Sequence, residues 1–346
     1  MEQVKCNTAS ASYDIIIASG AWQKSKDFSG RKLLVRDGNV KNPGIEADGE
    51  IVLTPGEQYK TFSAVESICR KAAQMHLNRK DRFIALGGGV TGDLTGFAAA
   101  IYMRGINFIK IPTTLLAMVD ASVGGKTAAD LPEGKNLIGA FHQPDAVLID
   151  PEFLTTLSFT DLTCGLAEVV KTAVILDGKF FDKLEQLGAS LVETPDFAVR
   201  YPELIKRCCE LKSMVVASDE KENGLRAILN YGHTFGHAVE QLSDFTIPHG
   251  VGVAIGMTVA GTLAADLGMW KNNDASRQLE LLKKLRLSTA IPRRFTPEQI
   301  LEVMRSDKKN DASGIRLVLP DGIGSARVVS GVQERAMISA LEKCYD

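Results

Sequence analysis

The sequence predicts a chain of two parts, an α/β domain followed by a mainly helical domain. Up to about residue 150, short apolar runs rich in β-branched residues alternate with segments of helical periodicity, which is typical of a mostly parallel sheet covered by helices. After Pro151 these runs nearly disappear, and apolar residues recur at helical spacing. Because 346 residues exceed the usual size of one domain, we expect two domains, residues 1–157 and 158–346.

Each expected element has its own local signal. The strands expected in the first domain are YDIIIA, KLLVRD, EIVLTP, RFIALGGG, FIKIPTT and AVLID, with a helix at about residues 62–75. Helices of the second domain are expected near residues 161–176, 198–217, 234–243, 251–267, 275–286 and 297–305. The stretch 315–329 carries Gly and Pro between apolar residues and predicts a hairpin-like piece.

Composition and charge exclude several classes of partner. A net charge of -2 and a pI near 6.3 provide no basic field for nucleic acid. The N-terminus shows no signal-peptide pattern, and the longest apolar region, Val251–Ala265, is shorter than the ~20 residues of a membrane span. The six cysteines contain no CxxC pair, which suits a reducing cytoplasm. We therefore expect a cytoplasmic protein that binds neither nucleic acid nor membranes.

A glycine-rich turn, GGGVTGD at residues 87–93, directly follows the strand RFIAL and precedes an apolar helix-like segment. Backbone N–H groups at such a turn can approach a phosphate, and the positive end of the following helix favours an anion. The spacing differs from the GxGxxG fingerprint, so a tight turn without a ligand stays an alternative. The turn predicts that the first domain binds a nucleotide.

Two further segments follow strands of the same domain. Gly56–Lys60 comes after EIVLTP, and Thr113 and Thr114 come after FIKIP. Both segments could reach a cofactor bound at the glycine-rich turn, although capping of a turn or helix is an equally ordinary use of such residues.

A cluster of charged residues lies between Asp120 and Asn136. Gly124-Gly125 presents Lys126, and a second loop presents Lys135 and Asn136. Lysines fixed beside glycines suit recognition of phosphate or carboxylate, because an ammonium is a compact charge with three donors. A solvated loop is the alternative interpretation.

Two charges of the second domain lie on one helical face. Glu168 and Lys171 are three residues apart and are surrounded by apolar neighbours, which favours a cavity lining over a surface ion pair. Lys212, on the next long helix, cannot be distinguished from an exposed lysine by its pattern.

Three of the five histidines are concentrated at positions 233, 237 and 249. His233 and His237 are i and i+4 on one helical face, and His249 follows Pro248 at the expected start of a helix. A carboxylate such as Glu168 with two imidazoles makes a three-ligand set of the kind found in catalytic zinc sites. Histidines satisfied by hydrogen bonds in a helical core are the alternative.

Together and in this order, these segments resemble the 3-dehydroquinate synthase family, within the wider group that includes sugar phosphate cyclases and glycerol dehydrogenases. The resemblance extends from Asp37 to the segment near 315–329. It is carried by GEQYK, GGGVTGD, MRGINFIKIPTTLLAMVDASVGGKTA, GKNLIGAFHQP, LAEVVKTAVI, RAILNYGHTFGHAVE, PHGVGVAIGM and SDKKN.

The resemblance implies a Rossmann-like α/β NAD domain, an all-α metal-binding domain and an active site in the cleft. It implies that zinc or cobalt is held by Glu168, His233 and His249. The implied nucleotide contacts are Asp37, Glu57, Lys60, Gly89, Val90, Thr91, Gly92, Asp93, Thr113, Thr114, Lys126, Lys135, Phe153, Leu154, Thr155 and Thr156. One departure is Pro55, where many family members carry an acidic or small residue.

The resemblance also implies roles in catalysis and substrate binding. The implied catalytic residues are Asp120, Lys126, Asn136, Lys171 and His237. The implied substrate contacts are Arg104, Lys212, Arg226, Asn230 and one of Lys308 and Lys309. Members of the family are commonly homodimers, and Arg104 is expected to reach the site of a neighbouring subunit.

The implied activity is that of a carbon–oxygen lyase of the shikimate pathway, which serves aromatic amino acid biosynthesis. It converts 3-deoxy-D-arabino-heptulosonate 7-phosphate, a sugar acid phosphate, into 3-dehydroquinate and phosphate. The implied steps are transient oxidation by NAD, phosphate elimination, re-reduction and intramolecular aldol closure. The alternatives are another sugar phosphate cyclase, a glycerol dehydrogenase-like oxidoreductase and a non-catalytic ligand-binding homologue.

Overall fold

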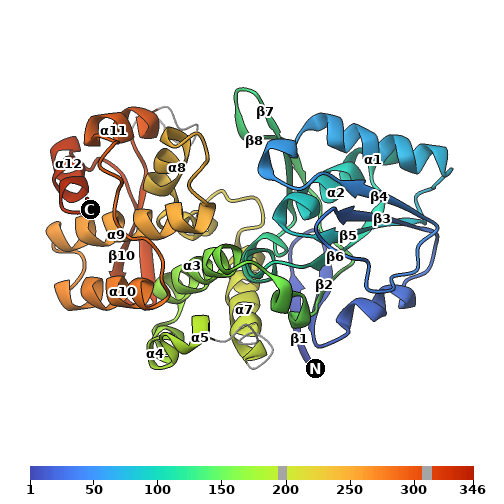
Figure 1. Cartoon of the computed structure of the whole chain (residues 1–346), viewed down its shortest axis with the longest axis horizontal. Helices are drawn as coiled ribbons and strands as arrows, with labels where there is room; N and C mark the ends of the chain where they lie inside the picture. The colour runs from blue at the N-terminus through green and yellow to red at the C-terminus, as the bar shows by residue number, and fades with distance from the viewer. Residues whose placement is uncertain (194–200, 306–313) are drawn as a thin grey trace. The chain divides into compact units, whose positions relative to one another are not determined.

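The structure is a computed structural model that describes residues 1–193, 201–305 and 314–346. The chain divides into two compact units (Figure 1). Unit 1 contains residues 1–157 and 198–221, the second stretch carrying the helix α7 (Pro202–Ser218), and unit 2 contains residues 158–197 and 222–346 as far as they are described.

Unit 1 is built on a sheet that, among the described residues, has seven strands in the order β1-β2-β9-β6-β5-β3-β4. All neighbouring strands are parallel except β1 and β2, which confirms the α/β class; the antiparallel β1 was not predicted. The bounds are β1 Glu2–Asn7, β2 Ser12–Ile17, β3 Lys32–Asp37, β4 Gly49–Leu53, β5 Arg82–Gly87, β6 Asn107–Pro112 and β9 Ala146–Ile149.

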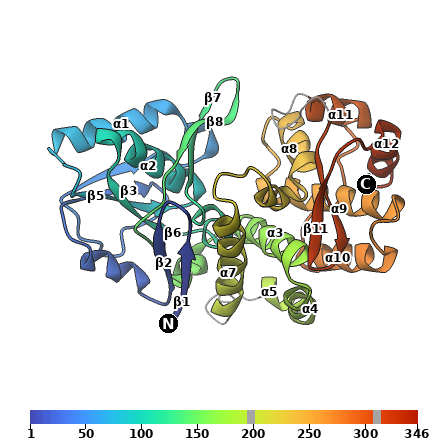
Figure 2. The same cartoon turned by 180° about the vertical axis from the view of Figure 1, so that it is seen from behind.

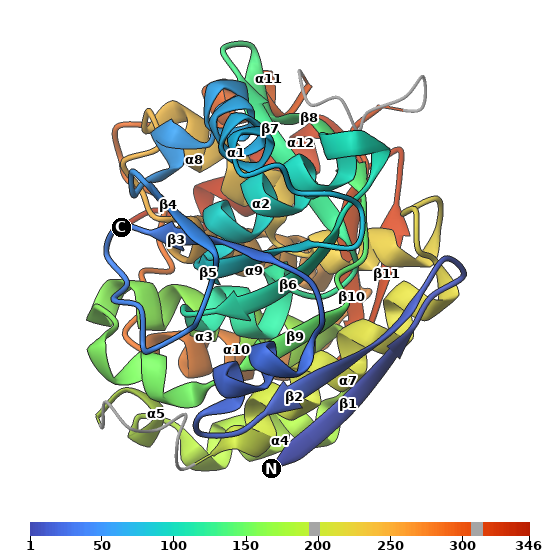
Figure 3. The ribbon, with the colours of Figure 1, turned by 90° about the vertical axis from the view of Figure 1, so that its right-hand side faces the viewer.

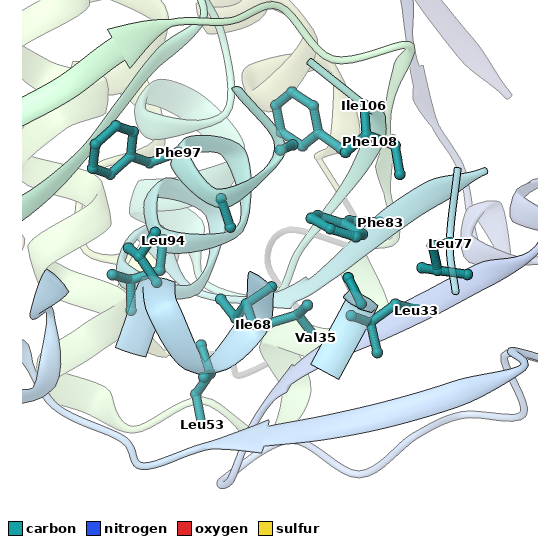
Figure 4. Close-up of a cluster of buried hydrophobic side chains, with 14 of the residues drawn as sticks. Leu33, Val35, Leu53, Ile68, Leu77, Phe83, Leu94, Phe97, Ile106 and Phe108 are labelled. Carbon is teal, nitrogen blue, oxygen red and sulfur yellow. The ribbon is translucent and has the colours of Figure 1, made fainter. Parts of the chain in front are cut away.

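Helices α1 (Phe62–Gln74) and α2 (Gly89–Ile101) cover one face of this sheet. Their apolar side chains, among them Ile68 and Phe97, pack with Phe83 of β5 in a cluster of buried residues (Figure 4). The other face packs against η1 (Ala21–Asp27) and η5 (Pro151–Thr156). The remaining short helices are η2 Glu57–Tyr59, η3 Tyr102–Arg104 and the π-helical turn η4 Ala117–Ala121.

The segment expected to present Lys126, Lys135 and Asn136 from two loops is a hairpin. Strands β7 (Lys126–Leu131) and β8 (Gly134–Phe141) pair antiparallel, with Lys126 opposite Phe141. The loop expectation was wrong here because most of the segment consists of residue types that are depleted in strands, namely Gly, Pro, Ala, Asn, Asp, Glu and Lys. The consequence is that Lys126 and Asn136 lie on one ordered hairpin.

Helix α7 corrects the predicted domain limits, because residues 158–346 were expected to form the second domain. The structure places α7 in unit 1, where it lies beside β1 and β2 (Figure 3). Lys206 of α7 contacts the carboxylate of Glu2 at 2.6 Å. Helical periodicity identifies a helix, but it does not indicate which domain the apolar face packs against.

In its described residues, unit 2 is helical with one two-stranded hairpin (Figure 2), as predicted. Its apolar central helix α9 packs against α3, α8, α10, α12 and β10. The bounds are α3 Phe159–Leu176, α4 Gly178–Leu187, α5 Ser190–Glu193, η6 Leu225–Asn230, α8 His233–Leu242, α9 His249–Asp266, α10 Asn272–Lys284, α11 Pro297–Arg305, β10 Leu317–Gly322, β11 Ser325–Val329 and α12 Glu334–Glu342.

Over the ranges that the structure describes, none of the helices combines the length and the apolar character that crossing a membrane requires.

Candidate active site

The carboxyl ends of the parallel strands gather the nucleotide-site residues that the sequence predicts. Parallel strands that run side by side end at one edge of the sheet, where ligands of α/β sheets bind. This edge carries Asp37 at the end of β3, Glu57 and Lys60 after β4, Gly89–Asp93 after β5, Thr113 and Thr114 after β6, and Phe153–Thr156 after β9.

The glycine-rich turn leaves its backbone bare. A Cβ at Gly87 would lie 2.6 Å from Thr91 Oγ1, and one at Gly88 would lie 3.2 Å from Thr114 Cγ2. The N-terminus of α2 also lacks a side-chain cap, so its first N–H groups are suited to bind an anion. A small cavity beside the turn is lined by Gly87, Gly88, Gly89, Gly92, Lys110 and Ala121, among others.

Lys60 connects the turn after β4 to two other elements. Its buried ammonium donates to Asp93 Oδ2 at 2.8 Å and to Asn136 Oδ1 at 2.6 Å. Burial acts to lower the pKa of Lys60, but the carboxylates of Asp93 and Glu57 outweigh it and raise this pKa. Lys135 lies 3.7 Å from Glu57 Oε1. The tip of the β7–β8 hairpin is therefore fixed against the nucleotide-site residues of unit 1.

Asp120, in the π-helical turn η4, is held by a buried lysine of α7. The Lys212 ammonium forms an ion pair with the Asp120 carboxylate and donates to the Asp120 carbonyl oxygen at 2.7 Å. The Lys212 residue is only 8% exposed. Its pattern in the sequence did not separate it from a surface lysine, because its partner comes from a segment 92 residues away.

Lys126 is exposed, and it directly follows two glycines with positive φ, Gly124 at 101° and Gly125 at 67°. The Gly124 N–H donates to the buried hydroxyl of Tyr13 at 3.1 Å. Burial raises the pKa of Tyr13 far above its ordinary value, so this hydroxyl stays protonated. Tyr13 supports the turn that presents Lys126, a contact that no local pattern indicates.

In unit 2, the side chains of Glu168, His233 and His249 converge. Glu168 lies in the middle of α3 and is 1% exposed. The Nε2 atoms of His233 and His249, which open helices α8 and α9, each lie 3.6 Å from Glu168 Oε1. The three predicted metal ligands are therefore together, although they come from three different helices.

The second nitrogen of each imidazole is already engaged. His233 Nδ1 lies 3.1 Å from the Tyr231 carbonyl oxygen, and His249 Nδ1 lies 3.0 Å from Glu240 Oε1. Because both partners are acceptors, each Nδ1 carries a proton, which makes Nε2 of each ring the atom that can bind a metal. Glu240 was missed by the sequence analysis; its position three residues after His237, on the same helical face, was the available signal.

The pKa values agree with a cation site. Burial acts to raise the pKa of Glu168, but Lys171 and His249 overcome it and lower this pKa to about 2. Burial, with the charge of Lys171, lowers the pKa of His233 well below its usual value. For His249, burial is outweighed by Glu168 and Glu240, which raise the pKa to about 10. Glu168 is therefore ionised and His233 neutral at pH 7, whereas a metal must displace a proton from His249.

The residues present fit a divalent metal. Ligand atoms bonded at ~2.0–2.2 Å in a tetrahedron stand roughly 3.3–3.6 Å apart, and the two Nε2–Oε1 separations of 3.6 Å match this spacing. Neither Glu168 oxygen accepts a well-formed hydrogen bond within the described residues, although Lys171 lies at ion-pair distance. His237, Glu240 and His249 also bring possible ligand atoms close together. A metal held by these three residues would, however, compete with the hydrogen bond by which Glu240 holds the His249 ring in place.

The remaining predicted residues are divided between the two units. In unit 2, Lys171 is buried and pairs with Glu168, while Arg226 and Asn230 lie in η6. The His237 ring centroid is 5.2 Å from that of His233. In unit 1, Arg104 is exposed and has a left-handed φ of 64°. Lys308 and Lys309 lie outside the described residues.

Glycines let the three ligand-bearing helices approach closely. A Cβ at Gly256 of α9 would lie 1.8 Å from the Gly232 carbonyl oxygen, next to His233. A Cβ at Gly250 of α9 would lie 2.2 Å from Cys164 Cα of α3. Real Cβ atoms do not tolerate such distances, so a larger residue would separate the helices and move their ligands apart.

Comparisons with known proteins match most of the chain to one family. The family model described as 3-dehydroquinate synthase N-terminal matches residues 50–164, and the C-terminal model matches residues 165–310. Two relatives bear the name 3-dehydroquinate synthase. The one from a Synechococcus species is 44% identical over 94% of this chain and 93% of its own. The one from a Picosynechococcus species is 46% identical over 93% of both chains.

Solved structures of related enzymes have the same fold. A 2-deoxy-scyllo-inosose synthase complexed with carbaglucose-6-phosphate, NAD⁺ and Co²⁺ gives a TM-score of 0.88 at 25% identity, covering 99% of this chain and 100% of its own. A 2-epi-5-epi-valiolone synthase from Streptomyces hygroscopicus, with NAD⁺ and Zn²⁺ bound, gives 0.87 at 29% identity, covering 96% and 97%. A protein from Sinorhizobium meliloti described as a "probable glycerol dehydrogenase", at 13% identity and a TM-score of 0.69, shares the fold alone.

We predict that Gly256→Ala lowers the affinity for zinc about 10- to 100-fold, the range seen when support of metal ligands is lost. The added methyl group pushes α9 away from the start of α8. Gly322→Ala is the matched control, because a Cβ there meets nothing within 4 Å. Zinc titration against a chromophoric chelator measures both variants, and equal affinities would contradict the close-approach argument.

We also predict that zinc affinity increases with pH between about 6 and 8, by up to about tenfold per pH unit. His249 has a raised pKa of about 10 in the metal-free protein, so below that pH a proton competes with the metal. The same titration, repeated across this range and corrected for chelator protonation, measures the slope. His76→Ala, which removes an exposed histidine of unit 1, should leave the slope unchanged. A pH-independent affinity would contradict the competition between the metal and a proton on His249.

Proposed function

The chain belongs to the 3-dehydroquinate synthase family, and from this premise we propose that it converts 3-deoxy-D-arabino-heptulosonate 7-phosphate into 3-dehydroquinate and phosphate. The observation that carries the proposal is the convergence of His233 and His249 on the buried carboxylate of Glu168. This donor set suits a metal that acts on substrate hydroxyl groups. Near-full-length similarity to relatives named for this activity supports the same conclusion.

We assign two cofactors to the chain, NAD and zinc or cobalt. NAD supplies a hydride acceptor that returns the hydride within one turnover, and the metal supplies a Lewis acid for the substrate hydroxyls. The strand-end residues of unit 1, including the bare turn at Gly89–Asp93, would hold the nucleotide. Glu168, His233 and His249 would hold the metal. The bound NAD⁺ and Co²⁺ or Zn²⁺ of the two related synthases support this assignment.

Lys171 is placed to move a proton near the metal. Its ammonium pairs with Glu168 and is almost completely buried. A substrate hydroxyl bound beside Glu168 would therefore lie near a group that can hold or release a proton. The neighbouring positive charge also favours the alkoxide character that develops when the hydroxyl loses its proton.

The phosphate and the carboxylate of the substrate need separate sets of donors. We assign the phosphate to Lys126, Asn136, Arg104 and His237. We assign the carboxylate to Lys212, Arg226 and Asn230, since cations and amides bind carboxylates strongly. Asn230 donates to Glu222 Oε1 at 2.8 Å, so its amide already faces a carboxylate oxygen, which supports this assignment. The carboxylate set favours a sugar acid phosphate over a sugar phosphate that has no carboxylate.

We further propose that the enzyme works as a homodimer in the cytoplasm. Ile101 and Met103 are 42% and 45% exposed beside Arg104, and exposed apolar side chains that gather together are typical of interaction surfaces. Met103 and Arg104 both have positive φ, 50° and 64°, and such strain is common at functional sites. These observations support a role for Arg104 at a subunit boundary.

The proposal is tested by incubating the purified protein with the heptulosonate phosphate, catalytic NAD and zinc or cobalt. Equal amounts of phosphate and 3-dehydroquinate, without net NADH and with loss of activity on chelation, are expected. Net NADH with polyols and no phosphate release would instead indicate a dehydrogenase. Turnover of a sugar phosphate that has no carboxylate, with none of the heptulosonate, would indicate another sugar phosphate cyclase.

We predict that Lys171→Ala lowers kcat by at least about 100-fold, the usual contribution of a positioned proton-transfer group, while zinc stays bound. Lys179→Ala, which removes an exposed lysine of the neighbouring α4, should retain full activity. Steady-state kinetics and zinc content distinguish the effects. Full activity of Lys171→Ala would remove this residue from the mechanism.

A further inference from the structure

Lys110 is a buried cation to which the family resemblance gave no role. It lies in β6 with only 2% of its surface exposed, and its side chain points to the face of the sheet that α2 covers, as does Phe108. Its ammonium lies 5.9 Å from the centre of the Phe108 ring. A fully buried lysine is rare and costs free energy, because the charge loses its water. Some other interaction must compensate for that cost.

The protein satisfies this ammonium only in part. Lys110 Nζ donates to the Ala121 carbonyl oxygen at 3.2 Å, at the end of the turn that carries Asp120. An ammonium has three N–H donors, and within the described residues Ala121 provides its one hydrogen-bond acceptor. Lys110 also lines the small cavity beside the glycine-rich turn. Two N–H groups of Lys110 are therefore left beside the glycine-rich turn, where no side chain covers the backbone.

The surroundings of Lys110 are short of negative charge. Its Nζ would lie 4.0 Å from a Cβ at Gly92, in the first turn of α2, where the helix dipole is positive. Burial, with the charges of Lys212 and Lys60, lowers the pKa of Lys110 to about 8, while Asp93 acts in the opposite direction. Asp93 is already paired with Lys60 at 2.8 Å, and Asp120 is paired with Lys212. An added anion would balance the excess positive charge.

We propose that Lys110 is a positioning residue for the nucleotide, whose ammonium attracts the pyrophosphate of the cofactor from beneath the glycine-rich turn. This inference rests on the proposed binding of NAD. The negative charge of the pyrophosphate compensates the positive charges of the α2 N-terminus and of the Lys110 ammonium. The same ammonium holds the Ala121 carbonyl, so it links the nucleotide site to the turn that carries Asp120.

The test is the dissociation constant of NAD, measured by calorimetry on the full chain between pH 6.5 and 9.5. Lys110→Met removes the charge and the donors, and Lys110→Gln restores a donor without the charge. Both variants should bind NAD about tenfold more weakly at pH 6.5, the size of one charge interaction in a protein. Lys80→Met removes an exposed lysine before β5 and should bind NAD as the wild type does.

The pH dependence of NAD affinity distinguishes an effect of the Lys110 charge from a structural role of its side chain. Since the protonated form attracts the anion, wild-type affinity should fall as the pH rises through about 8 and approach that of the variants. Both variants should lack this fall. Rescue by Gln, or equal affinities of wild type and both variants at pH 6.5, would overturn the inference and leave the proposed reaction standing. A wild type that turns over substrate but binds no NAD would overturn the inference and the cofactor assignment together.

Discussion

The site in unit 2 depends on one carboxylate that is removed from water. Glu168 is 1% exposed in the middle of α3, and a buried charge is tolerated only when opposite charges or a metal compensate it. Lys171 provides one such charge, and the imidazoles of His233 and His249 provide two ligands that face the same oxygen. The glycines of α9 follow from this constraint, because the ligands meet only if the helices approach closely.

In unit 1 the buried charges are cations, and they also need compensation. Its parallel strands end at one edge, where the bare turn before α2 offers N–H groups to an anion, and the buried ammonium groups of Lys60, Lys110 and Lys212 lie in the same unit. Lys60 and Lys212 are neutralised by Asp93 and Asp120, whereas Lys110 has no such pair among the described residues. A nucleotide that brings its own negative charge fits this arrangement.

Local patterns predicted what depends on local structure. Sequence alone predicts the alternation of strands and helices, the GGGVTGD turn and the i, i+4 spacing that puts His233 and His237 on one helical face. Each of these features lies within a short segment. The structure added what depends on distant segments: the packing of α7 on β1, the burial of Lys212 against Asp120, and the support of His249 by Glu240. Lys110 was read as one residue of an apolar strand, since only the approach of α2 and η4 shows that its charge is buried.

The central claim, that Glu168, His233 and His249 hold the metal, is tested most directly by a crystal structure of the zinc-loaded protein with anomalous scattering. The account predicts one peak at ~2.0–2.2 Å from a Glu168 oxygen and from the Nε2 atoms of His233 and His249, with Glu240 still bonded to His249 Nδ1. A peak bonded instead to His237, Glu240 and His249 Nδ1 would contradict it.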